Sequence, residues 1–157
     1  MEAPVDREEA VRLVNLAVSR EYNSLSNYVL HSSPYTTAAD DPALKAFTEV
    51  RDRQAATASW LVERLREDFG AGPTLRAFEH WKRDLNYLSI PYLVRFACGH
   101  YANVAAENDE LLKRAAGDPK LAPIFTRLRD EAKAHRAALE KHLPKWTEQP
   151  KEGPPPA

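Results

Sequence analysis

Apolar residues recur every three or four positions along four long segments of the chain, and this spacing predicts four amphipathic α-helices. The first expected helix starts at Asp6, which has Glu9 three residues later in the spacing of a capping box. The second has Pro42 at its first helical position and Gly70 at its end. Pro123 lies deep in the fourth helix, so a later start or a short 3₁₀ turn stays open there. The expected helices cover residues 6–32, 41–70, 89–117 and 118–143.

The connections between these helices predict their arrangement. Two connections are short, so the first helix should pair with the second, and the third with the fourth, as antiparallel hairpins. The remaining connection, from Gly70 to Ser89, has about twenty residues, enough extended chain to pass along a whole helix. The sequence therefore predicts an all-α four-helix bundle with up-down-down-up topology and one long crossover. This crossover is expected to cover one side of the bundle with its large apolar residues, Leu75, Phe78, Trp81, Leu85, Tyr87 and Leu88.

Composition favours one globular bundle domain over residues 1–146, followed by a disordered Pro-rich tail over residues 147–157. Apolar residues make up 43% of the chain and charged residues 29%, which is the mixture of a soluble protein. The formal net charge is −1 and no block of like charges occurs, so a nucleic-acid partner is not expected.

Other sequence features bear on the compartment. No apolar run approaches the ~20 residues of a membrane span, and the acidic start differs from a secretory signal peptide. We therefore expect a cytoplasmic protein without a membrane partner. Cys98 is the only cysteine, which excludes an intrachain disulfide and a thiolate cluster for zinc or iron–sulfur.

A polar residue interrupts each of the four apolar stripes near its middle. Burying a carboxylate and two imidazoles costs several kcal/mol unless each finds a charge partner, a hydrogen bond or a metal. Because the four stripes face one another in a bundle, we expect these residues to converge in one region of the interior. The interruptions are Glu21, Gln54 with Thr57, His100 and His135.

The first two helices resemble those of the ferritin-like superfamily, in particular its rubrerythrin and bacterioferritin branches. Members of that superfamily place a glutamate on the first helix and a Glu-x-x-His motif on the second. Glu21 is followed after seven residues by Tyr28, as in the family's first helix. Phe47 precedes Gln54 by seven residues and Thr57 by ten, so glutamine and threonine stand where the family has glutamate and histidine.

The last two helices extend the resemblance, which covers about residues 10–143. Segment 97–101 is similar to the family's third-helix motif, with His100 in place of its glutamate. In the fourth helix Ala132 stands where the family has a bridging glutamate, and His135, three residues later, keeps the family's histidine.

The resemblance implies the ferritin-like fold but argues against its di-iron centre. Of the six ligand positions of the family, only Glu21 and His135 are kept. Two neighbouring iron ions need several carboxylates to balance their charge, and Gln54 and Ala132 cannot supply them. Ferroxidase and di-iron peroxidase activity are therefore not expected. The haem site of bacterioferritins is not expected either, because Met1 is the only methionine.

Two interpretations of the central polar residues stay open. In the first, His100, His135 and Glu21 hold one divalent metal ion, either iron, zinc or manganese, and Gln54 lies beside it. In the second, the same residues form a metal-free hydrogen-bond network. The protein would then be a pseudo-enzyme or scaffold that acts through its surface or a dimer interface. The resemblance and the apolar residues of the crossover together imply a homodimer, and neither interpretation identifies a catalytic residue.

Overall fold

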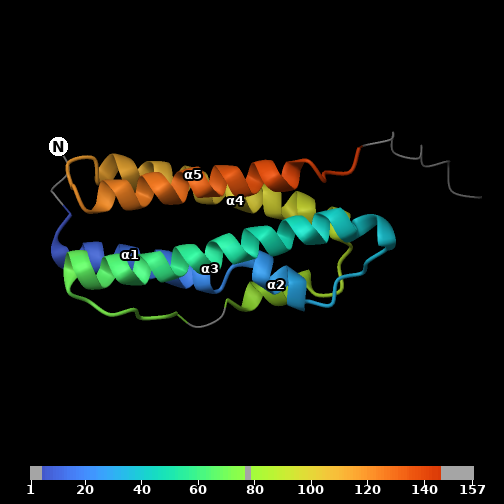
Figure 1. Ribbon diagram of the computed structural model, residues 1–157, viewed down its shortest axis with the longest axis horizontal. Coiled ribbons are helices and arrows are strands. Elements are labelled where there is room, and N and C mark those ends of the chain that lie inside the picture. The colour runs from blue at the N-terminus through green and yellow to red at the C-terminus, as the bar shows by residue number, and fades with distance from the viewer. Residues whose placement is uncertain (1–4, 77–78, 146–157) are drawn as a thin grey trace, which may run out of the picture.

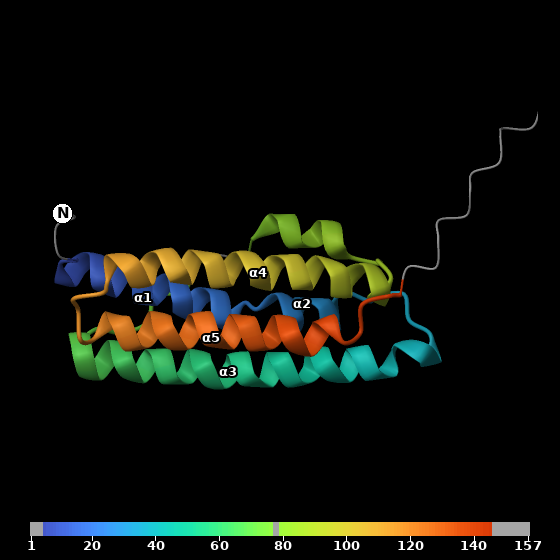
Figure 2. The same cartoon turned by 90° about the horizontal axis from the view of Figure 1, so that it is seen from above.

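The computed structural model of the protein describes residues 5–76 and 79–145. Within these ranges the fold is all-α, as the sequence predicts, and no β-strand forms; an isolated bridge joins Tyr35 to Ser89. The long helices lie side by side as a bundle (Figure 1, Figure 2). None of the helices described combines the length and apolar character that a membrane crossing requires. The tail predicted over 147–157 lies outside the described residues.

The described chain forms the α-helices and short 3₁₀ helices (η) α1 Arg7–Tyr22, α2 Leu25–His31, η1 Ala38–Asp40, α3 Asp41–Phe69, η2 His80–Leu85, α4 Ile90–Arg114 and α5 Leu121–Glu140. The long helices make two antiparallel pairs, in which α1 packs against α3 and α4 packs against α5. The crossover between the pairs passes along the bundle, so α3 and α4 run in the same direction (Figure 1).

Local capping explains several helix ends that the sequence predicts. Asp6 Oδ1 accepts a hydrogen bond from the N–H of Glu9 at 2.8 Å and begins α1. Gly70 adopts a left-handed φ of 59° and its N–H donates to the carbonyl of Arg66, which ends α3. Ser89 occupies the N-cap position of α4.

The single first helix predicted over 6–32 is wrong, because the helix breaks at Asn23. Asn23 ends α1, and Ser24 begins α2 by accepting a hydrogen bond from the N–H of Asn27 at 3.1 Å. Lys82, from η2, donates to the carbonyl of Asn23 at 2.5 Å and gives that group a partner. Asparagine and serine side chains hydrogen-bond nearby backbone groups, which favours them at helix ends over helix interiors.

Three other helix ends differ from the prediction by three residues, including the end of α5 at Glu140 instead of residue 143. α5 begins at Leu121 instead of Asp118, whose Oδ1 accepts a hydrogen bond from the N–H of Leu121 at 3.0 Å. The later start places Pro123 in the first turn, where its missing N–H leaves no helical hydrogen bond unmade. α4 ends at Arg114, before the predicted end at Gly117.

The apolar core has two large parts with a polar layer between them. One part packs around Leu65 and Phe125, and the other packs around Phe47 and Leu93. The predicted polar interruptions lie at the level between these parts. The apolar side chains there form only a small cluster of Val104, Ala105 and Ala132.

The crossover covers the bundle less completely than the sequence predicts. Leu85 is buried and Leu88 is half-buried, and both pack against the core. Leu75 and Tyr87 are instead 48% and 77% exposed. Phe78 and the side chain of Trp81 lie outside the described part of the structure.

Candidate functional site

The four predicted site residues line one small cavity at the middle of the bundle. Glu21 comes from α1, Gln54 from α3, His100 from α4 and His135 from α5. The cavity measures about 10 Å³, which is close to the smallest volume that admits one water molecule. Its walls are Arg20, Glu21, Gln54, His100, Tyr101, Val104, Ala132 and His135.

A chain of hydrogen bonds joins four helices beside this cavity. The hydroxyl of Tyr101 donates to Gln54 Oε1 at 3.0 Å. Because the hydroxyl proton is used there, Ser26 Oγ, which lies 2.7 Å from the same hydroxyl, acts as the donor to it. The side-chain amide of Gln54 in turn hydrogen-bonds Glu21. Since Ser26 belongs to α2, the chain runs from α2 through α4 and α3 to α1.

Glu21 is a buried carboxyl group whose hydrogen bonds are incomplete. Its exposed fraction is 8%, and its Oε2 has no hydrogen-bond partner among the described residues. Burial raises the pKa of Glu21 from 4.5 to about 7; the hydrogen bond from Gln54 opposes this change, and the nearby Glu131 carboxylate adds to it. The carboxyl group of Glu21 therefore gains or loses its proton near neutral pH.

His135 is the second buried group with unmet hydrogen bonds. Its exposed fraction is 3%, and neither Nδ1 nor Nε2 has a partner in the part of the chain that the structure describes. Its ring meets Tyr101 edge-on, with 5.4 Å between the ring centroids. Burial lowers the pKa of His135 to about 4, so the ring is neutral at physiological pH. A neutral imidazole brings one donor and one acceptor to the cavity.

His100 lies at the edge of the cavity and is only half-buried, which corrects its predicted place in the core stripe. The neighbouring Tyr101, 1% exposed, takes the fully buried position on α4. Burial lowers the pKa of His100 to about 4, and the positive charges of Arg20 and Lys82 add to this effect. Arg20 is itself ion-paired with Glu107 at 2.5 Å, which offsets part of its charge.

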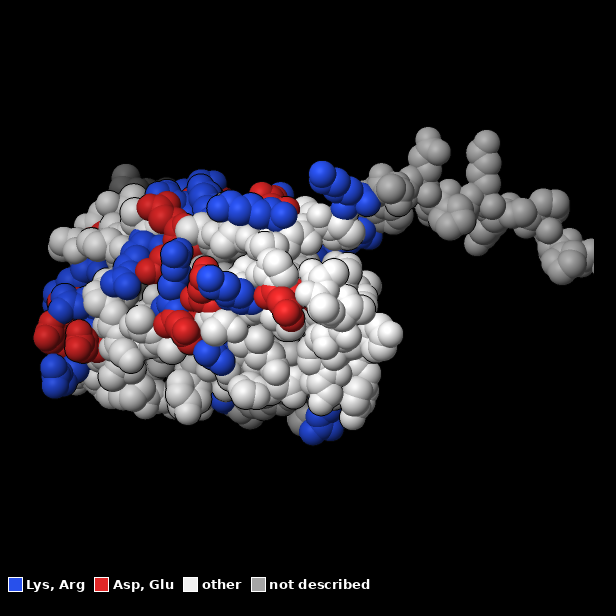
Figure 3. Space-filling model, turned by 45° about the vertical axis from the view of Figure 1, so that its right-hand side comes forward, with Lys and Arg blue, Asp and Glu red and all other residues white. Residues whose placement is uncertain are grey.

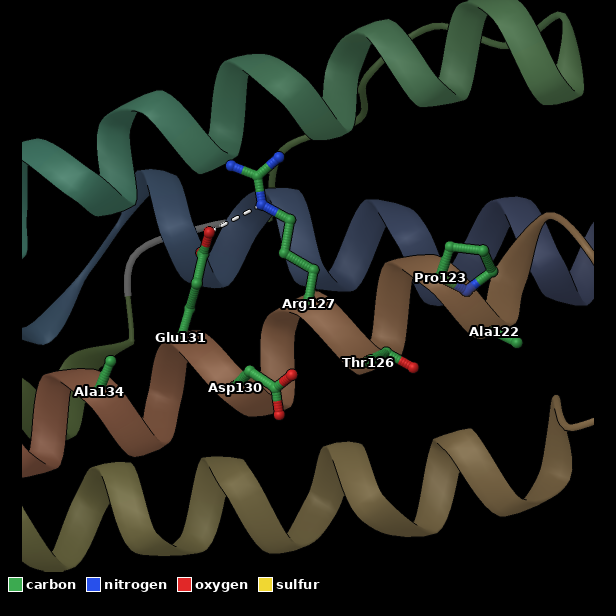
Figure 4. A pocket seen from close by; sticks show the side chains of 7 residues that line it. All are labelled: Ala122, Pro123, Thr126, Arg127, Asp130, Glu131 and Ala134. Carbon is green, nitrogen blue, oxygen red and sulfur yellow. Dashed lines mark hydrogen bonds and ion pairs between the residues drawn. The ribbon is translucent and has the colours of Figure 1, made fainter.

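Thr57 belongs to a second polar group, between α3 and α5. Its hydroxyl donates to Glu131 Oε2 at 2.5 Å, while Arg127 Nε donates to Glu131 Oε1 at 2.7 Å. Figure 4 shows Arg127 and Glu131 reaching from α5 toward α3. The guanidinium of Arg127 also lies 4.1 Å from the ring centroid of Trp60. Thr57 is therefore hydrogen-bonded to a carboxylate and does not line the central cavity.

The residues present do not fit a pair of metal ions. Ala132 lines the cavity but offers no ligand atom, and Gln54 already accepts from Tyr101. As the described side chains lie, no three of His, Cys, Asp and Glu are close enough to hold a metal ion together. Glu21 and His135 nevertheless line the cavity with unpartnered oxygen and nitrogen atoms, the donor types that zinc, iron and manganese accept.

Sequence reasoning missed two residues that shape this site, Ser26 and Glu131. Ser26 is 0% exposed and anchors the hydrogen-bond chain, while Tyr101 connects it to Gln54. Glu131 raises the pKa of Glu21 and stands one position before Ala132 in the sequence. The sequence does not indicate that Ser26 is buried, because a serine within a helical pattern is usually exposed to solvent.

The sequence matches no protein-family model, no curated protein and no solved structure. The function of the site is therefore argued from the chemistry of its own residues. Those residues are Glu21, His100 and His135, beside which Tyr101 bonds Gln54 and Gln54 bonds Glu21.

Proposed function

We propose that the protein is a ferritin-like bundle whose central cavity binds one divalent metal ion, iron, zinc or manganese, in place of a di-iron pair. One observation carries the proposal: Glu21 Oε2 and both nitrogens of His135 are buried without partners, and both residues line the same cavity. A metal ion would satisfy a carboxylate oxygen and an imidazole nitrogen together. His100, on the cavity wall, would be the third ligand.

The protonation of His135 and the hydrogen bonding of Glu21 support this proposal. His135 is neutral at physiological pH because burial lowers its pKa to about 4, and a neutral imidazole is the form that binds metals. The amide of Gln54 holds one side of the Glu21 carboxyl group, so the other oxygen stays available. Because no three ligand residues already lie at binding distance in the described structure, ion binding must draw these side chains together. When bound, the ion would supply Lewis-acid or redox chemistry.

The arrangement of the helices supports the ferritin-like part of the proposal. The crossover passes along the bundle, and α3 and α4 run in the same direction (Figure 1). One long crossover of this kind is found in ferritin-like bundles. This likeness concerns the fold alone, and the metal is argued from the site.

Elemental analysis of protein purified without chelator tests the metal proposal. The expected result is one metal ion per chain for the native protein and none for His135→Ala. His31→Ala is the matched control, because His31 is exposed in the last turn of α2. Two ions per chain would contradict the loss of the di-iron site. No bound ion after incubation with iron, zinc or manganese would leave the metal-free bundle as the better interpretation.

A second candidate function is that of a metal-free bundle acting through its surface, as a homodimer. The observation that favours it is an uncharged end of the molecule formed by segments 32–39 and 85–94, which contain no Lys, Arg, Asp or Glu. The N–H of Tyr35 donates to the carbonyl of Leu88 at 2.9 Å, which joins the two segments. Figure 3, which brings this end forward, shows a broad area without charged residues.

Exposed aromatic rings mark the same end. Tyr35, Tyr87 and Tyr92 are 70%, 77% and 52% exposed. Uncharged surfaces with exposed tyrosines are typical of protein interfaces. Light scattering at micromolar concentration should then give a dimer mass, and Tyr87→Glu should convert it to a monomer. A monomer mass for the native protein would contradict this candidate.

A further inference from the structure

The break between α1 and α2 leaves a groove on the surface of the bundle. The groove has a volume of about 630 Å³, which lies in the range of small-molecule binding sites. Its wall on α3 includes Ala55, Ala58 and Val62, and the crossover adds Pro73 and Leu75. Small side chains on α3 and the missing helical turn at the break together account for the space. The body of a bound molecule would thus contact mainly apolar groups.

Glu21 lines this groove as well as the central cavity. It is the only acidic residue among the described groove walls, and one oxygen of its buried carboxyl group, Oε2, has no hydrogen-bond partner among the described residues. Arg51 is the only basic wall residue, and its charge is offset by Asp52, 2.9 Å away. The groove therefore combines an apolar wall with one buried carboxyl group that can still accept a hydrogen bond.

We infer that this groove binds a small organic amine, with its apolar body against α3 and its ammonium group on Glu21. A protonated amine supplies both a hydrogen-bond donor and a positive charge, and thus offsets the cost of burying the carboxylate. An alcohol of the same shape supplies only the donor. A carboxylate ligand would be repelled by Glu21. The inference does not depend on a bound metal, although an ion and an amine would both use the carboxyl group of Glu21.

Benzylamine is a suitable probe, with benzyl alcohol and benzoate as neutral and anionic counterparts of the same size. Titrations of the native chain at about pH 8, followed by calorimetry or NMR, should show that benzylamine binds at least tenfold more tightly than either counterpart. Equal binding of the alcohol or the benzoate, or no binding of benzylamine, would overturn the inference.

Two neighbouring alanines give a matched pair of variants. Ala55 and Ala56 are both exposed on α3, but only Ala55 lines the groove. Ala55→Phe should fill the groove and weaken benzylamine binding at least tenfold, whereas Ala56→Phe should leave it unchanged. Circular dichroism and the thermal midpoint show whether both variants are folded. Equal effects of the two substitutions would place the amine elsewhere and reject the groove.

Two further variants separate the groove from the metal proposal. Glu21→Gln should abolish the preference for benzylamine over benzyl alcohol. His135→Ala should keep benzylamine binding, because His135 lines the central cavity and is not a wall of the groove. Loss of metal with retained amine binding in His135→Ala would support both proposals. Retained preference for the amine in Glu21→Gln would overturn the role of Glu21.

Discussion

The hydroxyl of Tyr101 donates a hydrogen bond to Gln54 Oε1 at 3.0 Å, and both side chains are buried where the helices meet. Tyr101→Phe keeps the ring but removes this hydroxyl, so Gln54 and Ser26 each lose a partner inside the core. A buried polar group without a partner costs ~1–3 kcal/mol, and the free energy of unfolding should fall by about that amount. Urea denaturation measures the change. Tyr22→Phe is the control, because Tyr22 is 61% exposed, and an equal loss there would count against the network.

The raised pKa of Glu21 predicts how stability depends on pH. Because its pKa is about 7 in the folded chain against an ordinary 4.5, the folded chain holds this proton more tightly. The corresponding stability is fully present below pH 4.5 and is lost as the pH rises through about 7. Glu21→Gln cannot lose a proton, so its stability relative to the native chain should rise by roughly 3 kcal/mol across this interval.

Urea denaturation at several pH values, with chelator present, measures this difference. The lowered pKa of His135 acts with the opposite sign, since its contribution is present above pH 6.5 and is lost as the pH falls toward 4. Because both proteins keep His135, its effect cancels in the comparison. Glu49→Gln, on the exposed face of α3, is the control. A pH-independent difference between Glu21→Gln and the native chain would contradict the burial of an ionisable Glu21.

Lys82 should stabilise the break between α1 and α2. Its side chain is buried, and its Nζ donates to the carbonyl of Asn23 at 2.5 Å. Lys82→Met keeps most of the apolar stem but removes the donor, so we expect a loss of ~1–3 kcal/mol in the free energy of unfolding. Arg83→Met, in the same 3₁₀ helix but exposed, is the matched control. Equal effects of the two variants would show that the hydrogen bond from Lys82 to Asn23 does not stabilise the break.

A second carboxylate in the cavity should make the thermal midpoint depend on whether a divalent metal ion is bound. Gln54→Glu removes the amide that hydrogen-bonds Glu21 and places two acidic groups together, which should lower the thermal midpoint by several degrees without metal. If the cavity binds a divalent ion, zinc or manganese should raise the midpoint of this variant more than that of the native chain. The double variant Glu21→Gln with Gln54→Glu restores one carboxylate and is the control. A midpoint insensitive to metal in all three proteins would contradict the metal proposal.

Much of the bundle follows from local sequence signals. Asp6 caps α1 with its side chain, and Ser89 occupies the N-cap position of α4. Gly70 ends α3 because glycine tolerates a positive φ. The polar residues at the cavity were also predictable, since each interrupts an apolar stripe at the same level. These features depend on neighbours within one helical turn, or on helical periodicity alone.

Other features depend on contacts between distant segments and were not predictable. The apolar periodicity continues from Glu21 to Leu25 across the break at Asn23, and the carbonyl exposed there is bound by Lys82 from the crossover. Two adjacent residues on α4 could each have faced the core. Packing between helices, rather than spacing, gives the buried position to Tyr101 and the edge position to His100.

The short helix α2 has a consequence for the lifetime of the hydrogen-bond chain beside the central cavity. Seven residues are fewer than the ~12–15 that an isolated helix needs, so α2 depends on contacts such as the one from Ser26 to Tyr101. Its amide protons should therefore exchange with solvent faster than those in the middle of α3 or α4. Transient fraying of α2 would break the hydrogen bond between Ser26 and Tyr101, and Tyr101 in turn supports Gln54 beside the cavity. The opening rate of one short helix would then set how long the hydrogen-bond chain beside the cavity stays complete.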